Sequence, residues 1–298
     1  MIVAGTRAEL AAARARLAGP VVLVPTMGAL HDGHRALLRR ARELAGTGAR
    51  PGTVAVSIFV NPLQFAPNED LDRYPRTLNE DLRTCAAEHV DLVFAPGVRE
   101  MYPAQQLVTV DPGPAGGILE GEFRPGFFRG VLTVVLKLFS LVRPDVAVFG
   151  QKDAQQLALV RQMVADFALG IEIEAVPTVR AADGLALSSR NKYLSSPERA
   201  VAPVLHQALA AGAAAAAGGP RAALEAARRV LALAGGALTV DYLALVERGT
   251  YGPVRDDAFE GAAVLAIAAR LGGTRLIDNV PVQIGAGQPG MAEHAADD

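Results

Sequence analysis

Two histidines, His31 and His34, lie three residues apart in the string PTMGALHDGH, which follows an apolar run at residues 21–24. An apolar run, a glycine-containing turn and then helical spacing are typical of a strand, a loop and a helix. The N-terminus of such a helix offers free N–H groups and positive potential, which suit phosphate. Two imidazoles on one face of the first turn can donate to phosphate oxygens. The pattern predicts a nucleotide site with Gly33 open to a flat base; the alternative is an ordinary helix capped by Asp32.

A lysine, Lys152, follows another apolar run at residues 145–149 and is one of only three lysines among 29 lysine and arginine residues. Codon bias explains most of this preference for arginine. Against that background, a retained lysine indicates a position where a compact point charge serves better than a planar fork. We therefore expect its ammonium group to contact phosphate. Asp153 and Gln156 have the spacing of a helix capping box, which is the alternative role for both side chains.

Two side-chain amides, Asn61 and Gln64, follow a β-branched run at residues 53–60. An amide can donate a hydrogen bond to a hydroxy acid and accept one from it. Asn61 precedes a proline, so turn formation is an alternative explanation for it. No such explanation applies to Gln64, whose amide is therefore the better candidate for contacting a ligand.

These candidates follow apolar runs in a chain that alternates strand and helix patterns. The expected strands are residues 21–24, 53–60, 91–94, 145–149 and 171–176. One expected helix begins at residue 33, and three further helices cover residues 77–89, 130–142 and 157–167. This alternation predicts an α/β fold with a Rossmann-like, doubly wound parallel sheet covered on both faces. In such a sheet, ligands bind at the carboxyl ends of the strands, where the candidate residues stand.

The pattern changes after Asn191, where the chain becomes rich in alanine. Helices are expected at residues 197–218 and 220–233, and strands at 238–246, 263–269 and 274–280. These elements predict a smaller C-terminal α+β domain. We divide the chain into a nucleotide- and substrate-binding domain at residues 1–178, the smaller domain at 179–284 and a disordered tail at 285–298.

Composition excludes several classes of protein. The 29 basic and 31 acidic residues give a net charge of −2, which argues against a nucleic-acid binder. The single cysteine, Cys85, rules out an intrachain disulfide framework and a cysteine-rich zinc site. The N-terminus lacks the pattern of a secretory signal, and the apolar run at residues 131–142 is too short to span a bilayer. We expect a cytoplasmic protein without a membrane partner.

Several long strings together resemble one family. The His31–His34 pattern is similar to that of the nucleotidyltransferase superfamily, which includes class I aminoacyl-tRNA synthetases. PTMGALHDGH, SIFVNPLQF at 57–65, DLDRYPRTLNED at 70–81, GQKDAQQ at 150–156 and VPTVRAADGLALSSRN at 176–191 resemble the pantoate–β-alanine ligase family. The resemblance implies ATP-dependent condensation of pantoate with β-alanine through a pantoyl-adenylate, releasing AMP and pyrophosphate. It also implies a homodimer, and a smaller domain that closes over ATP.

The resemblance further implies a set of site residues. His34, His31 and Lys152 are the expected catalytic residues; we interpret the histidines as stabilisers of charge, because pyrophosphate is a good leaving group that needs little general acid. Gln64, Gln156 and Asn61 are expected to bind pantoate, and Glu80 and Asp81 to lie near Mg²⁺. The expected ATP-binding residues are Met27, Gly28, Ala29, Leu30, His31, Asp32, Gly33, His34, Gly150, Gln151, Lys152, Asp153, Val179, Leu187, Ser188, Ser189 and Arg190.

Two positions depart from the family pattern. The family usually has glutamate where this chain has Gln151, and histidine where it has Phe127. These departures are the support for a nucleotide-binding protein that has lost catalysis. A nucleotidyltransferase that releases a stable nucleotidyl product is a further alternative, and it would lack the amine-dependent second step. The ligase ranks first, because His31, His34, Lys152 and Arg190 are all present.

Overall fold

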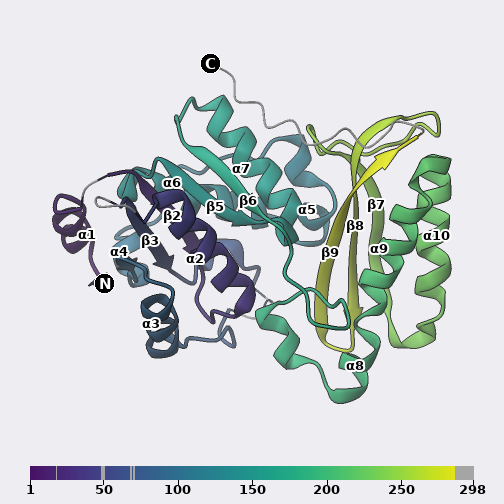
Figure 1. Ribbon diagram of the computed structural model, residues 1–298, viewed down its shortest axis with the longest axis horizontal. Helices are drawn as coiled ribbons and strands as arrows, with labels where there is room; N and C mark the ends of the chain where they lie inside the picture. Colours follow the sequence, from purple (N-terminus) through teal and green to yellow (C-terminus); the bar gives the residue numbers. More distant parts are fainter. Residues whose placement is uncertain (18, 48–50, 68, 70, 286–298) are drawn as a thin grey trace. The chain divides into compact units, whose positions relative to one another are not determined.

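The computed structural model describes the whole chain except residues 18, 48–50, 68, 70 and 286–298 (Figure 1). The chain divides into two compact units. Met1–Val179 and Leu187–Ser189 form the first unit, while Arg180–Ala186 and the chain from Arg190 onward form the second. All but the first residue of the expected disordered tail lies outside the described residues.

The first unit is built on a six-stranded sheet in which all neighbouring strands are parallel, in the order β1-β4-β3-β2-β5-β6. The strands are β1 (Ile2–Ala4), β2 (Val21–Thr26), β3 (Thr53–Ile58), β4 (Leu92–Phe94), β5 (Val146–Gly150) and β6 (Glu172–Val176). Because β2 pairs with β3 on one side and β5 on the other, the chain winds away from β2 in both directions. The carboxyl end of β2 is therefore the switch point at which open α/β sheets bind ligands.

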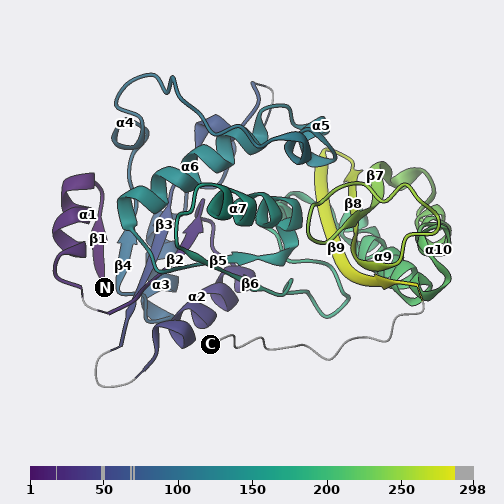
Figure 2. The same ribbon diagram turned by 90° about the horizontal axis from the view of Figure 1, so that it is seen from above.

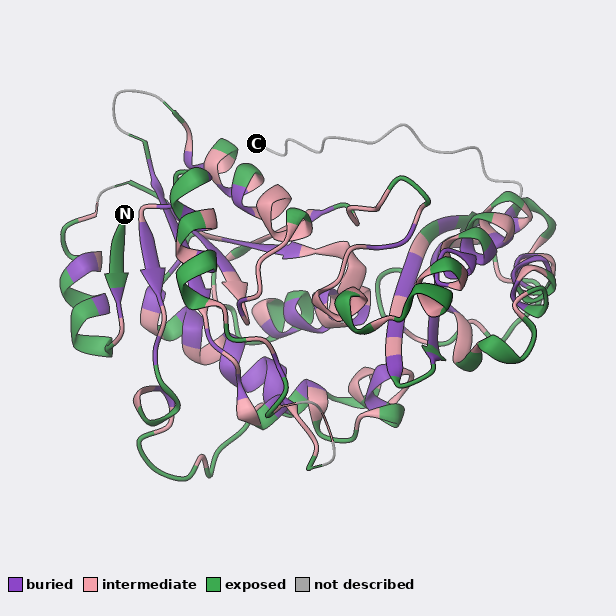
Figure 3. Ribbon diagram, turned by 90° about the horizontal axis from the view of Figure 1, so that it is seen from below, coloured by how far each residue is buried: buried purple, intermediate pink, exposed green. Residues whose placement is uncertain are grey.

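Alternating side chains of β2 enter two separate hydrophobic layers. Val21 and Leu23 pack with α1 (Arg7–Arg14), α6 (Phe127–Val142) and α7 (Ala154–Asp166), whereas Val22 and Val24 pack with α2 (Asp32–Ala45) and α3 (Leu78–Ala87). Figure 2 shows α6 and α7 on one side of the sheet and α2 and α3 on the other. The central strands are buried and the outer faces of the helices are exposed (Figure 3). The predicted doubly wound sheet is confirmed.

The second unit has an antiparallel sheet of β7 (Thr239–Glu247), β8 (Gly261–Leu271) and β9 (Thr274–Ile284). Its helices include α8 (Ser196–Val201), α9 (Val204–Ala214) and α10 (Pro220–Ala232). Gly212 lets α9 approach its neighbours, because a Cβ there would lie 2.4 Å from Leu265 Cδ2 and 2.9 Å from the Ala223 carbonyl oxygen. The predicted α+β class of this part is confirmed.

The prediction of a single helix at residues 197–218 is wrong. The segment forms α8, α9 and a short 3₁₀ turn at Ala216–Gly218. Pro203 lies between the two helices and has no N–H to continue a helical ladder, so it ends the first helix. Among the helices of the described residues, none has the length and apolar composition required to cross a membrane.

Candidate active site

The loop after β2 turns sharply before α2 begins. Gly28 has φ +80° and Ala29 has φ +51°, so two consecutive residues are left-handed. This conformation costs an L-residue such as Ala29 about 1–2 kcal/mol. The Asp81 carboxylate compensates by accepting from the backbone N–H of Ala29 (3.1 Å) and of Leu30 (2.8 Å). A Cβ at Gly28 would lie 2.9 Å from Asp81 Oδ2, so the carboxylate fits only beside a glycine.

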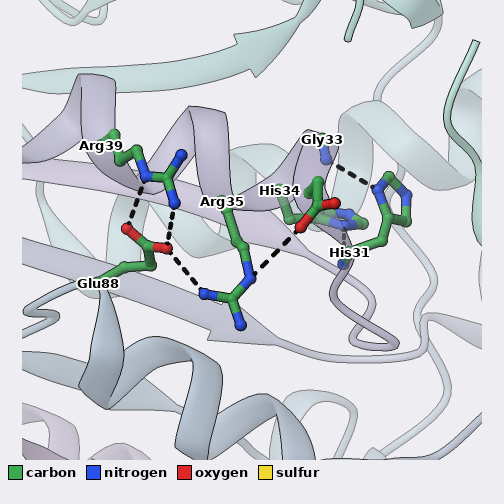
Figure 4. Close-up of polar contacts among 7 residues, drawn as sticks. His31, Gly33, His34, Arg35, Arg39 and Glu88 are labelled. Atoms are coloured by element: carbon green, nitrogen blue, oxygen red, sulfur yellow. Dashed lines mark hydrogen bonds and ion pairs between the residues drawn. The ribbon is translucent and has the colours of Figure 1, made fainter. Parts of the chain in front are cut away.

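The two histidines cap the helix that they begin. The His31 Nδ1 atom accepts from the Gly33 N–H (3.1 Å), and the His34 Nδ1 atom accepts from the His31 N–H (3.2 Å) (Figure 4). The ring centroids are 4.2 Å apart. Asp32, which the alternative interpretation made the cap, is instead the first helical residue, and its side chain is 79% exposed. His31 takes the cap position because its ring folds back over Gly33.

These hydrogen bonds fix the protonation of both rings. Each Nδ1 atom is an acceptor, so in the neutral ring the proton lies on Nε2. Burial lowers the pKa of His34 to about 3, with smaller effects from His31 and Lys152. Burial and then Lys152 also lower the pKa of His31. Near neutral pH the pair is therefore uncharged and carries two Nε2–H donors.

We expected the backbone at Gly33 to be open to a flat base, but the structure shows that this surface is covered. A Cβ at this position would meet His31 Cε1 at 2.8 Å, so the imidazole occupies the space. The same Cβ would lie 4.0 Å from the Cβ of Leu187. Leu187 donates its backbone N–H to the Val179 carbonyl oxygen (2.9 Å), which holds this predicted ATP-binding segment near the histidine loop.

Lys152 lies in a 3₁₀ turn, Gln151–Asp153, at the carboxyl end of β5. Its Nζ atom is 3.9 Å from Asp153 Oδ1. Since its charge lowers the pKa of both histidines, it acts electrostatically on the pair. Asp153 occupies the cap position of α7 without a capping hydrogen bond, so the capping box with Gln156 does not form. The half-buried Gln156 amide has no hydrogen-bond partner in the part of the chain that the structure describes.

Asn61 is 1% exposed and uses its whole hydrogen-bonding capacity inside the protein. Its Nδ2 atom donates to Gln64 Oε1 and to the Gly130 carbonyl oxygen, both at 3.1 Å. Its Oδ1 atom accepts from the Leu63 N–H (3.3 Å) and the Tyr102 hydroxyl (2.9 Å). Contrary to expectation, Asn61 has no donor or acceptor left for a substrate and instead orients Gln64.

Gln64 ends the 3₁₀ turn Pro62–Gln64 and is 8% exposed. Its Nε2 atom lies 2.9 Å from the sulfur of Met27. A thioether is a weak acceptor, so the Gln64 amide keeps most of its donor capacity for a stronger partner. The turn packs closely on α6, since a Cβ at Gly130 would lie 2.1 Å from the Leu63 carbonyl oxygen. The separate contact between Gln64 and Met27 places Gln64 next to the loop after β2.

The model of the pantoate–β-alanine ligase family matches residues 2–281. A pantothenate synthetase of Thermobifida fusca is 61% identical over 292 residues, which cover 95% of this chain and 96% of that protein. The chain belongs to the pantoate–β-alanine ligase family. Its activity is therefore the ATP-dependent joining of pantoate to β-alanine, as the resemblance implied.

Solved structures of pantoate–β-alanine ligases share the fold. A crystal structure of pantothenate synthetase from Thermus thermophilus has a TM-score of 0.86 and 46% identity, covering 94% of this chain and 99% of that one. A pantoate–β-alanine ligase from Francisella tularensis, described as complexed with Beta-gamma ATP and β-alanine, has a TM-score of 0.75 and 33% identity. The alignment covers 94% of this chain and 97% of that one.

The acidic pair that the family resemblance placed near Mg²⁺ does not form one site. Glu80 is exposed on α3, whereas Asp81 is 2% exposed and directed at the histidine loop. The described residues also contain no group of three or more His, Cys, Asp or Glu side chains that could hold a metal ion. The residues present therefore do not fit a metal held by the protein alone.

Phe127, which replaces the usual family histidine, packs against a guanidinium group. The Arg124 Cζ atom lies 3.7 Å from the centroid of the Phe127 ring. Arg124 also pairs with both carboxylate oxygens of Glu69, at 2.8 and 2.7 Å, and donates to the Gln64 carbonyl oxygen at 3.3 Å. Arg124 thus connects the chain before α6 to the turn that carries Gln64, a link that the sequence analysis did not predict.

The side chain of Gln155, rather than that of Gln156, holds the glycine-rich loop at residues 115–120, which precedes α6. Its Nε2 atom donates to the carbonyl oxygens of Ala115 (2.7 Å) and Ile118 (2.9 Å), and its Oε1 atom accepts from the Glu120 N–H (3.2 Å). Sequence analysis missed this residue. The available signal was its position one helical turn before Leu159, on the buried face of α7.

The remaining candidates divide between the units. Ser188 and Ser189 belong to the first unit with Leu187, whereas Arg190 belongs to the second. In the second unit, Arg180 pairs with the buried Asp278 through two hydrogen bonds of 2.6 and 2.9 Å. This pair anchors the hairpin that immediately precedes Leu187.

Proposed function

We propose that the loop after β2 and the turn after β5 together carry the adenylation step of this ligase. In that step a pantoate carboxylate oxygen attacks the α-phosphorus of ATP, and the bond to pyrophosphate breaks. The amine of β-alanine then attacks the acyl carbon, loses a proton and displaces AMP. The supporting observation is the His31–His34 pair, whose Nδ1 atoms accept backbone hydrogen bonds and whose Nε2–H groups are therefore donors.

The two histidines stabilise the phosphate charge as neutral donors. A proton-donating imidazolium at His34 would be scarce near neutral pH, because its pKa is about 3. Lys152 supplies the positive charge that the neutral rings lack. Fixed donors and charges of this kind stabilise a phosphoryl-transfer transition state without reorganisation.

Residues around these groups form the proposed ATP site. Backbone groups of Met27–His34 and of Gly150–Asp153 line it, together with Val179 and Leu187–Ser189, and Arg190 is proposed as a further ATP-binding residue. Magnesium enters with ATP as part of the substrate.

Pantoate binds Gln64 and Gln156 in this proposal. Both amides lie at the carboxyl end of the sheet, and Asn61 orients the first of them. The small-molecule partners are pantoate, β-alanine and ATP, and nucleic acid has no role. A homodimer remains a proposal that the family resemblance supports, and a cytoplasmic location remains a proposal from the sequence pattern.

Isotope exchange between pyrophosphate and ATP tests the reaction order. We expect exchange with pantoate and MgATP alone, because the adenylate forms before the amine is needed. A requirement for β-alanine would contradict the two-step mechanism. A stable nucleotidyl product would support the nucleotidyltransferase alternative, and a lack of any turnover would support the inactive nucleotide binder.

Replacement of Gln64 by alanine should weaken the use of pantoate far more than the use of ATP. Loss of a buried hydrogen-bonding partner costs about 1–3 kcal/mol, or roughly five- to 150-fold in kcat/KM for pantoate. Steady-state kinetics with each substrate varied in turn measure the effect. Gln162→Ala, at an exposed glutamine of α7, is the matched control. Unchanged pantoate kinetics in a folded Gln64→Ala protein would assign Gln64 to structure alone.

A further inference from the structure

We infer that Asp81 is a positioning residue, whose buried carboxylate sets the conformation of the loop that presents His31 and His34. The inference rests on the proposed roles of the two histidines. Asp81 is 2% exposed, and its two oxygens accept from consecutive backbone N–H groups, at 2.8 Å from Leu30 and 3.1 Å from Ala29. These hydrogen bonds direct the carboxylate at the loop.

The loop needs such an anchor because of its backbone conformation. Ala29 has φ +51°, which an L-residue adopts only when surrounding interactions hold it there. The two N–H groups that Asp81 binds are those of Ala29 itself and of the next residue. His31 follows directly, and its own N–H donates to His34 Nδ1. The orientation of both rings therefore depends on the turn that Asp81 fixes.

Three hydrogen-bond donors surround the Asp81 side chain. The Thr77 hydroxyl donates to its Oδ2 atom at 3.2 Å, in addition to the two backbone groups. It also lies in the first turn of α3, where the helix dipole favours negative charge. These donors give both oxygens of the buried side chain hydrogen-bond partners within the protein.

The other end of α3 holds the chain beyond the histidines. Glu88 follows the last residue of α3 and accepts from Arg39 Nε and Nη2 and from Arg35 Nη1, at 2.8–2.9 Å (Figure 4). Both arginines belong to α2. The histidine pair thus lies between two attachments to α3, one at residues 29–30 and one at residues 35–39. Removal of the first attachment should disturb the loop while the second keeps α2 on α3.

The test is Asp81→Asn, which keeps the side-chain shape but replaces one acceptor by an N–H₂ group facing a backbone N–H. We expect the kcat of ATP–pyrophosphate exchange to fall about ten- to hundredfold, since a charge-assisted hydrogen bond is lost. The free Mg²⁺ concentration that gives half-maximal exchange should not change. Histidine ¹⁵N spectra, assigned with His34→Gln, should show that the shifts of the His34 ring move and that its pKa rises toward the ordinary value.

Asp166→Asn, at an exposed aspartate of α7, is the matched control and should leave every readout unchanged. If excess Mg²⁺ restores the activity of Asp81→Asn, the residue is a metal ligand and the inference is wrong. Wild-type kcat and unshifted His34 signals in folded Asp81→Asn also overturn it. If that protein does not fold, Thr77→Val removes one donor to Asp81 and should lower kcat about threefold with a smaller His34 shift; the absence of both effects overturns the inference. The spectra need no turnover, so they test Asp81 even if the proposed adenylation roles fail.

Discussion

Replacement of Lys152 by alanine is expected to lower the rate of pantoyl-adenylate formation by about two to three orders of magnitude. Loss of one preorganised contact to a developing oxyanion costs about 3–4 kcal/mol. The effect should be large here because His31 and His34 are neutral, which leaves Lys152 as the nearby charge that lowers both of their pKa values. The fold should remain intact, since the lysine lies in a short turn at the carboxyl end of β5. Single-turnover measurement of adenylate formation, with circular dichroism for folding, tests this.

Lys152→Arg should recover only part of the rate. A guanidinium group is wider than an ammonium group, and its charge is more diffuse. Lys192→Ala, at an exposed lysine, is the matched control for the loss of one positive charge. Near-normal adenylate formation in Lys152→Ala would remove the residue from the mechanism. Full activity of Lys152→Arg would show that arginine serves equally well at this position. The rarity of lysine in the chain would then carry no information about function.

Replacement of His34 by alanine should have a comparable effect, about a hundredfold or more in adenylate formation. The variant loses an Nε2–H donor and also the Nδ1 acceptor that holds the His31 N–H. His34→Gln retains a donor and should be less impaired. His89→Gln, at an exposed histidine, is the control for the same exchange. If His34→Ala forms the adenylate at the wild-type rate, the proposed role of the pair is wrong.

The same residue predicts a dependence of stability on pH. His34 has a pKa of about 3 in the folded protein against an ordinary value of 6.5. Between these values the unfolded chain binds a proton that the folded chain does not, so the free energy of unfolding falls as pH falls below 6.5. His31 acts in the same direction. Thermal unfolding of His34→Gln should therefore lose less stability on acidification than that of the wild type, and an equal loss would contradict the low pKa.

The sequence predicted the sheet well because its strands are short, strongly apolar runs separated by clear turn residues. β1 was missed, since its three residues pair along one edge and leave Ile2 and Val3 partly exposed. The helix expected at residues 197–218 failed because alanine content dominated the pattern, while Pro203 decided the break. Local signals therefore gave the topology, but single residues determined where elements ended.

For the site, sequence could predict which residues stand at the carboxyl ends of strands but not how they are paired. The role of Asp81 depends on a contact with residues 51 and 52 positions away in the chain. The cap at His31 was not predicted, because an aspartate follows it and aspartate is the commoner capping residue. Contacts of this kind have no periodic signature in one sequence.

The hydrogen bonds around Asn61 have a consequence for how the substrate site tolerates mutation. Its partners include Tyr102 and Gly130, which lie 41 and 69 residues further along the chain. The orientation of Gln64 therefore exists only once β3, α6 and the segment between them have come together. Substitutions remote from the substrate that loosen the packing of α6 should raise the KM for pantoate before they measurably lower the melting temperature. In this protein, the KM for pantoate would thus be a sensitive measure of how well the first unit is packed.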